Sequence, residues 1–251
     1  TKICQSFCMR KLTITFLTIV FCLTSSIAWS ETVKPDDLVK RNGIIYKKFT
    51  DKPYSGSVEG KDKDGEFHKG IIKNGKREGL WEKYHENGQL FWKGTFKDSK
   101  EEGIWKSYDE NGSLSSKTTY KDGERDGVSE LYHENGSLSS KTTYKDGGKE
   151  GVEEFYQKNG HLYWKGTWKN GKLEGVWKSY DENGSLYQKE TYKDGKKDGV
   201  VEGYHKNGQL WTKGTYKNGK KEGVWELYND SGSLYKKNTY KDDKLIKEEE
   251  F

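Results

Sequence analysis

The chain has 251 residues, of which 30% are apolar and 34% charged, so it lacks the apolar content of an ordinary compact globular domain. Its 9 Trp, 17 Tyr and 9 Phe exclude a solvated, disordered coil. With 30 Gly and only 2 Pro, the composition predicts a thin, turn-rich β protein.

The first 30 residues have the pattern of an export signal. Met9 is the only methionine and is the expected natural start, which would make the preceding residues upstream read-through. Arg10-Lys11 precedes an apolar stretch, Leu12–Leu23, and Ala28-Trp29-Ser30 offers a cleavage point. We therefore expect residues 1–30 to be a signal peptide and the protein to be exported, either periplasmic or at the cell surface. The alternative is an uncleaved N-terminal anchor.

All three cysteines precede the expected cleavage point, at Cys4, Cys8 and Cys22. The exported chain would then carry no thiol for a disulfide, a zinc site or a nucleophile. Cleavage also removes three basic residues and lowers the formal net charge from +5 to +2. Acids and bases alternate along the remaining chain, which is typical of a solvated surface and argues against a nucleic-acid-binding protein.

Two atypical segments precede the regular part of the chain. Residues 31–60 contain both prolines, Pro35 and Pro53, and are predicted to be an N-terminal capping segment. Residues 61–78 form a degenerate repeat, in which Asp64-Gly65 and Lys73-Asn74-Gly75-Lys76 stand for two turns.

Residues 79–246 repeat every 24 positions without an insertion, and a charged tail, 247–251, follows them. Each of the seven units begins with a glycine, at 79, 103, 127, 151, 175, 199 and 223. A Tyr, a Leu and a later aromatic residue recur at fixed places, exemplified by Tyr180, Leu186 and Tyr192. Such a period is the signature of a repeat architecture in which each unit packs on its neighbours.

Each unit contains two turn signals separated by aromatic, β-branched and long polar residues. Asp181-Glu182-Asn183-Gly184 suits a type I turn with a glycine bulge, and Asp194-Gly195-Lys196 suits a three-residue turn. The residues between the turns favour strands. The predicted fold is therefore all-β: an elongated antiparallel β-meander of tandem 24-residue β-hairpin repeats in a single twisted sheet.

The turns also predict which side chains share a face of the sheet. Tyr180 is expected opposite Leu186, and Leu186 opposite Tyr204. One face would then carry Val176, Tyr180, Leu186 and Tyr192. The other face would carry Trp177, Tyr187, Lys189 and Thr191. By the same parity, three further tryptophans are expected on the first face: Trp92, Trp164 and Trp211.

The pattern Gly-x-Trp-x-x-Tyr-x-x-Asn-Gly-x-Leu, followed by Tyr-Lys-Asp-Gly-Lys-x-Asp-Gly, resembles the MORN-variant repeat of bacterial exported proteins over about residues 42–246. The resemblance implies β-hairpin repeats and no catalytic residues. It also implies two kinds of role, because some relatives are described as antitoxins of toxin–antitoxin pairs and eukaryotic MORN repeats tether membranes or bind proteins. Ser129, Glu153 and Val201 depart from the family's Trp position.

The histidines and acids do not form a metal or catalytic constellation in the sequence. His85, His133 and His205 share one turn position, but the closest two are two repeats apart, roughly 20 Å. The Asp109 and Asp181 turns lack the ligand spacing of a calcium-binding loop and are better explained as Asx turns. We therefore predict a non-enzymatic protein with no metal and no cofactor.

Aromatic residues on the second face are the candidate ligand-binding site: Trp81, Trp105, Trp177, Trp225, Tyr163, Tyr187 and Tyr235. Rows of aromatic residues with polar neighbours clamp peptides or stack on sugars, and the alternative is cross-strand packing that stiffens the sheet. The favoured hypothesis is an exported scaffold that binds a protein or peptide in the cell envelope. The alternatives are binding to cell-wall glycan and an antitoxin role, whereas near-neutral charge argues against a membrane-surface binder.

Overall fold

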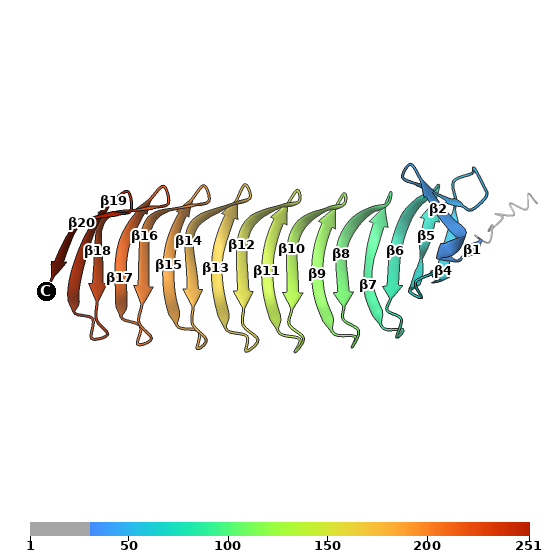
Figure 1. Ribbon diagram of the computed structural model, residues 1–251. Helices are drawn as coiled ribbons and strands as arrows, with labels where there is room; N and C mark the ends of the chain where they lie inside the picture. The colour runs from blue at the N-terminus through green and yellow to red at the C-terminus, as the bar shows by residue number, and fades with distance from the viewer. Residues whose placement is uncertain (1–30) are drawn as a thin grey trace, which may run out of the picture.

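The computed structural model describes residues 31–251, which form one elongated sheet with a small cap at its N-terminal end (Figure 1). The predictions about the export signal and the cysteines lie outside the described residues. Within the described residues, no helix is long and apolar enough to span a membrane.

The cap consists of four short elements. These are β1 (Thr32–Val33), the 3₁₀ turn η1 (Pro35–Asp37), β2 (Leu38–Arg41) and β3 (Ile44–Lys47). β1 pairs in parallel with the first strand of the meander, and β2 and β3 form a separate hairpin.

The meander follows chain order from β4 to β20 (Figure 1). Its first part comprises β4 (Gly56–Lys61), β5 (Phe67–Lys73), β6 (Lys76–Tyr84), β7 (Leu90–Lys97), β8 (Lys100–Tyr108), β9 (Leu114–Lys121), β10 (Glu124–Tyr132) and β11 (Leu138–Lys145). Its second part comprises β12 (Gly148–Tyr156), β13 (Leu162–Lys169), β14 (Lys172–Tyr180), β15 (Leu186–Lys193), β16 (Lys196–Tyr204), β17 (Leu210–Lys217), β18 (Lys220–Tyr228), β19 (Leu234–Lys241) and β20 (Lys244–Glu250). All neighbouring strands of the meander are antiparallel, which confirms the predicted fold class.

The Asn-Gly turns have the predicted geometry. In the turn that joins β14 to β15, the Gly184 N–H donates to Asp181 O at 3.0 Å, and Gly184 adopts a φ of +83°. The Asp181 N–H donates to Ser185 O at 2.9 Å and closes the loop. Tyr180 lies opposite Leu186, as predicted.

The prediction of a three-residue Asp-Gly-Lys turn is wrong. Lys193 pairs with Lys196, so only Asp194 and Gly195 form the turn, and both have positive φ, 50° and 83°. This is the geometry of a two-residue type I′ hairpin turn, which Asp tolerates almost as well as Asn. β16 then bulges around Gly199, and the register continues with Gln188 opposite Gly203. Leu186 therefore does not pair with Tyr204.

The prediction that Val176, Tyr180 and Leu186 share a face is confirmed, but the faces predicted for Tyr192, Lys189 and Thr191 are wrong. Between Ser179 and Tyr180 the register shifts by one residue, because Tyr187 is an unpaired extra residue in β15. A one-residue shift exchanges the faces of everything beyond it. Tyr192 consequently lies beside Trp177, with ring centroids 6.0 Å apart.

One face, named here the tryptophan face, carries Trp177, Gln188, Glu190 and Tyr192. The opposite valine face carries Val176, Lys178, Tyr180, Leu186, Lys189 and Thr191. Trp92 and Trp164 also lie on the tryptophan face and not on the valine face, because they contact Trp105 and Trp177 at centroid distances of 5.0 and 4.9 Å.

Along both rows of turns, at the two ends of the strands, side-chain hydrogen bonds join successive repeats. The rows are named here the Asn-Gly edge and the Asp-Gly edge. At the Asn-Gly edge, His205 Nε2 donates to Tyr228 O at 3.0 Å, and Asn207 Nδ2 donates to Asp230 O at 2.6 Å. At the Asp-Gly edge, a carboxylate of Glu174 accepts a hydrogen bond from the N–H of Asp194 at 3.0 Å. Each repeat thus satisfies polar groups of the next, which makes stability a sum over neighbours.

Candidate functional site

The four tryptophans of the predicted site are built into the sheet. Trp81 and Trp225 are only 6% and 7% exposed, and Trp105 and Trp177 are half-buried. The Trp81 indole N–H donates to Ile71 O at 3.0 Å, which fixes the ring against the preceding strand. These side chains therefore offer little surface to a ligand.

Each of these tryptophans packs on a glycine of the preceding strand. A Cβ added to the glycine would stand 2.0 to 2.2 Å from the indole ring, at Gly70, Gly94, Gly166 and Gly214. Where a residue with a Cβ occupies this place, the partner is not tryptophan. The three observed pairs are Thr118 with Ser129, Thr142 with Glu153 and Glu190 with Val201. Cross-strand packing thus explains why Ser129, Glu153 and Val201 replace tryptophan in three repeats.

The tyrosines of the predicted site have a different environment. Tyr163, Tyr187 and Tyr235 are 54%, 54% and 41% exposed, and Trp211, which is 43% exposed, occupies the equivalent position in the sixth repeat. All four are the unpaired bulge residues that directly follow the repeated Leu. Bulges re-aim side chains, and here they project four aromatic side chains from consecutive repeats. We call these four residues the aromatic row.

The aromatic row is restricted to the last four repeats. In the first full repeat the equivalent Phe91 is half-buried and packs on His85, with ring centroids 4.6 Å apart. The next two repeats have Ser115 and Ser139 at this position. Trp211 was missed in the sequence analysis because it was grouped with Trp92 and Trp164, although it directly follows Leu210 and those two tryptophans stand one position later in their repeats.

Hollows separate the members of the aromatic row. One of about 770 Å³ lies between Tyr163 and Tyr187, and its walls include Tyr156, Tyr180 and Glu182. A second, of about 420 Å³, lies between Tyr187 and Trp211, and its walls include Leu186, Tyr204 and Lys206. The row is therefore a series of aromatic side chains and intervening depressions with polar groups at their margins.

The valine face carries a lattice of tyrosine, glutamate and lysine. Tyr156 donates to Glu154 at 3.0 Å, and Lys165 forms an ion pair with the same carboxylate at 2.7 Å. The Lys165 hydrogen bond lowers the pKa of Glu154, with burial opposing it and Tyr156 assisting. Burial and the Glu154 hydrogen bond raise the pKa of Tyr156 to about 12. These groups stabilise one another and are not arranged for proton transfer to a substrate.

Histidines at the turns are structural donors. His85, His133 and His205 each bond through Nε2 to the carbonyl of a tyrosine in the next repeat. In the part of the chain that the structure describes, one group has the spacing of metal ligands: Asp62, Glu66 and His68. Its atoms already have protein partners, since Asp62 bonds His68 at 2.8 Å and Glu66 pairs with Lys83 at 2.6 Å.

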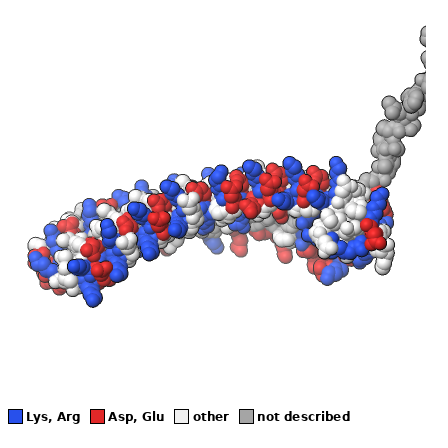
Figure 2. Space-filling model, turned by 90° about the horizontal axis from the view of Figure 1, so that it is seen from above, with Lys and Arg blue, Asp and Glu red and all other residues white. Residues whose placement is uncertain are grey.

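Charge is mixed along the sheet. Figure 2 looks onto the edge with the Asp-Gly turns and shows basic and acidic side chains interspersed over its whole length. This agrees with the alternation in the sequence and with a surface exposed to solvent.

The repeats match a family model for the MORN repeat variant at residues 77–98, 101–122, 125–146, 173–194, 197–218 and 221–242, which together make up more than half of the chain. The chain belongs to the MORN repeat variant family. The MORN-variant unit at 149–170 is outside the matched residues, yet it forms the same hairpin, β12–β13. It has Glu153 at the Trp position. No curated protein matches the chain.

The MORN repeat is a non-catalytic repeat module. Its strand framework accounts for most of the repeated residues of this chain, whereas the aromatic row is an addition of the C-terminal repeats.

Proposed function

We propose that this MORN-variant protein is an exported, non-catalytic scaffold that binds an extended segment of a protein partner in the cell envelope. The observation that carries the proposal is the aromatic row, because four large side chains in consecutive repeats remain about half exposed. Exposed aromatic side chains are enriched at protein interfaces, where they supply most of the binding energy. The sequence pattern of residues 1–30 supports export.

The spacing of the row suits an extended peptide. Two strands per repeat at about 4.8 Å place successive aromatic residues roughly 10 Å apart. A segment in the extended polyproline II conformation advances about 3.1 Å per residue with three residues per turn, so every third residue would face one depression of the row. Between Tyr163 and Tyr235 the row spans roughly 29 Å, which corresponds to about nine residues of the partner.

Polar groups beside the row can complete such a contact. Glu182 lies in the wall of the first hollow alone and Lys206 in the wall of the second alone, whereas Asp181 lines both. A bound segment with a basic residue over the first hollow and an acidic residue over the second would match this order of charges.

The proposal is tested by site-specific photocrosslinking in envelope extracts. A photoreactive phenylalanine derivative at Tyr187 is expected to capture a defined protein, whereas the same derivative at Val176, which is exposed but lines neither hollow, is not. Tyr187→Ala combined with Trp211→Ala should abolish recovery of that protein in a pull-down, and Val176→Ala combined with Val200→Ala should leave it unchanged. Equal recovery by all variants would contradict the proposal.

Glycan binding is the second candidate, favoured by the amide and carboxylate groups beside the aromatic rings. Gln188 and Glu182 line the hollow next to Tyr187, and such groups hydrogen-bond sugar hydroxyls. If the protein is retained on purified, protein-free cell wall, and Tyr187→Ala combined with Trp211→Ala abolishes this retention, the ligand of the aromatic row is a glycan and not a peptide. Absence of retention would leave the protein partner as the proposal.

A further inference from the structure

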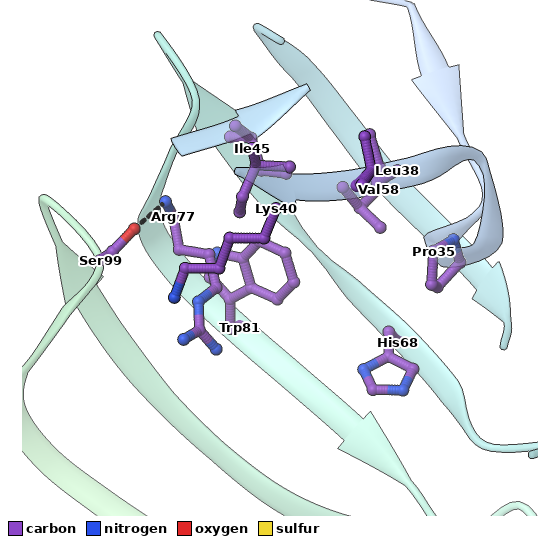
Figure 3. A pocket seen from close by; sticks show the side chains of 11 residues that line it. Pro35, Leu38, Lys40, Ile45, Val58, His68, Arg77, Trp81 and Ser99 are labelled. Atoms are coloured by element: carbon purple, nitrogen blue, oxygen red, sulfur yellow. Dashed lines mark hydrogen bonds between the residues drawn. The ribbon is translucent and has the colours of Figure 1, made fainter. Parts of the chain in front are cut away.

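The N-terminal cap lies over the start of the tryptophan face, and the two together line an open cavity of about 290 Å³ (Figure 3). Its apolar walls come from both sides: Leu38 and Ile45 from the cap hairpin, and Val58, Ile72 and Trp81 from the sheet. Val58 and Ile72 are only 2% and 1% exposed, so the floor of the cavity is part of the packed core. A concave site with mostly apolar walls and a small number of polar groups is typical of a small-molecule site.

Two cationic side chains line the same cavity. Figure 3 shows the Lys40 amino group and the Arg77 guanidinium on the same side of the Trp81 ring. The Arg77 guanidinium lies over Phe96, 3.9 Å from the ring centroid. Within the described residues neither side chain forms an ion pair or a side-chain hydrogen bond, and Arg77 bonds Ser99 only through its backbone N–H. Glu101 acts on Arg77 only through space, so the donors of both groups are not used by a hydrogen bond.

Arg125 occupies the position of Arg77 two repeats later, where no cap covers the sheet. Arg125 lies over the Tyr144 ring at 5.2 Å and donates to the hydroxyl of that tyrosine at 3.2 Å. At the capped end, Phe96 takes the place of the tyrosine and offers no oxygen. The cavity is therefore lined by an arginine that lacks the acceptor of its later counterpart.

We propose that this capped cavity binds a small molecule with a flat apolar body and a single anionic head group. The body packs against Trp81 and Val58, and the head group accepts charge-assisted hydrogen bonds from Arg77 and Lys40. The site is separate from the aromatic row, and it stands whether or not the row binds a protein.

Calorimetric titration with a matched pair of probes tests the proposal. Naphthalene-2-carboxylate and naphthalene-2-carboxamide share one apolar body, and only the carboxylate is an anion. The carboxylate is expected to bind at least about tenfold more tightly, since hydrogen bonds to charged groups contribute more than neutral ones. Equal affinities, or no binding of either probe, would overturn the proposal.

Substitutions test whether Arg77 and Lys40 cause the higher affinity for the carboxylate. Arg77→Gln and Lys40→Gln should each reduce the affinity of the carboxylate towards that of the amide, whereas Arg125→Gln, the matched control, should leave both affinities unchanged. Preserved discrimination in the variant that combines Arg77→Gln with Lys40→Gln would contradict the assignment.

Nuclear magnetic resonance locates the probe in the unaltered protein. The indole N–H signal of Trp81 should shift on titration with the carboxylate, and that of Trp225, about six repeats away and outside the cap, should not. A shift at Trp225 of the same size would show that the probe binds the sheet generally and would overturn the proposal.

Discussion

Trp105 packs directly on Gly94: a Cβ at residue 94 would stand 2.1 Å from the indole ring. The same relationship joins three other tryptophans to glycines, whereas Thr118 faces Ser129 and bonds it at 2.9 Å between hydroxyl oxygens. Two positions 11 residues apart are therefore coupled by packing, and each repeat uses either a glycine–tryptophan pair or a pair of smaller side chains.

Gly94→Thr alone should destabilise the protein by about 2–3 kcal/mol, because the new side chain overlaps the indole ring. Combined with Trp105→Ser, which reproduces the Thr118–Ser129 pair, the loss should be smaller than the sum of the two single losses by more than about 1 kcal/mol. Urea denaturation of the four proteins measures this coupling. Additive losses would contradict the packing argument.

The buried carboxylate of Glu153 predicts a second coupling. It is 1% exposed and bonds Lys149 at 2.7 Å, Thr142 at 3.0 Å and the Trp168 indole at 2.5 Å. Lys149→Met should destabilise by about 3 kcal/mol, because it leaves a buried charge without its counter-ion.

Adding Glu153→Val to Lys149→Met, which gives this repeat the aliphatic residue present at Val201, should restore most of the lost stability. The denaturation midpoints of the single and double variants measure the recovery. A double variant no more stable than Lys149→Met would show that the ion pair is not the source of the effect.

The hydrogen bond from His205 to Tyr228 predicts that the turn histidines join repeats. His205→Ala should cost about 1 kcal/mol, the usual net contribution of one hydrogen bond. His205→Gln should recover part of it, since Gln157 makes an equivalent bond to Asp181 O at 2.9 Å. Added zinc should change the denaturation midpoint of neither the parent nor the variants, and a zinc-dependent shift would contradict the structural role.

Acid should weaken the lattice on the valine face. Interactions with lysine and tyrosine lower the pKa values of Glu154, Glu202 and Glu226 below the ordinary 4.5. The unfolded chain then binds protons at higher pH than the folded one, so this stability is present above pH 4.5 and is lost as the pH falls through the lowered pKa values. Urea midpoints at several pH values should decline over this range, and more steeply in the parent than in Glu154→Gln.

Alkali should act on the same lattice with the opposite sign. The pKa of Tyr156 is raised from 10.0 to about 12, so its contribution is complete below pH 10 and is lost as the pH rises through 12. A titration followed by phenolate absorbance should show that Tyr156→Phe removes one tyrosine that ionises at higher pH than an ordinary tyrosine. If the parent and the variant ionise identically, the Tyr156–Glu154 bond does not persist in solution.

The sequence was sufficient to predict the repeat architecture and one of its two turns. The spacing of 24 and the Asn-Gly signals determine strand number, order and the pairing of Tyr180 with Leu186. The faces were not predictable by counting alternation, because Tyr187 is an unpaired residue and one such residue inverts the pattern.

The candidate site was predicted in part. Tyr163, Tyr187 and Tyr235 were identified, but Trp211 was assigned to the other face, although it directly follows the repeated Leu, as the three tyrosines do. The cap cavity left no local signal, since Lys40 and Arg77 are 37 positions apart and meet only through folding of the cap onto the sheet.

Distances between spin labels at the position that directly follows the repeated Leu test the central claim, that successive repeats extend linearly along one sheet. The chain from residue 31 has no cysteine, so labels can be placed by Tyr163→Cys with Tyr235→Cys and by Ser115→Cys with Tyr235→Cys. At roughly 10 Å per repeat, electron–electron resonance should give about 29 Å for the first pair and about 48 Å for the second. Distances that do not increase with the number of intervening repeats would contradict it.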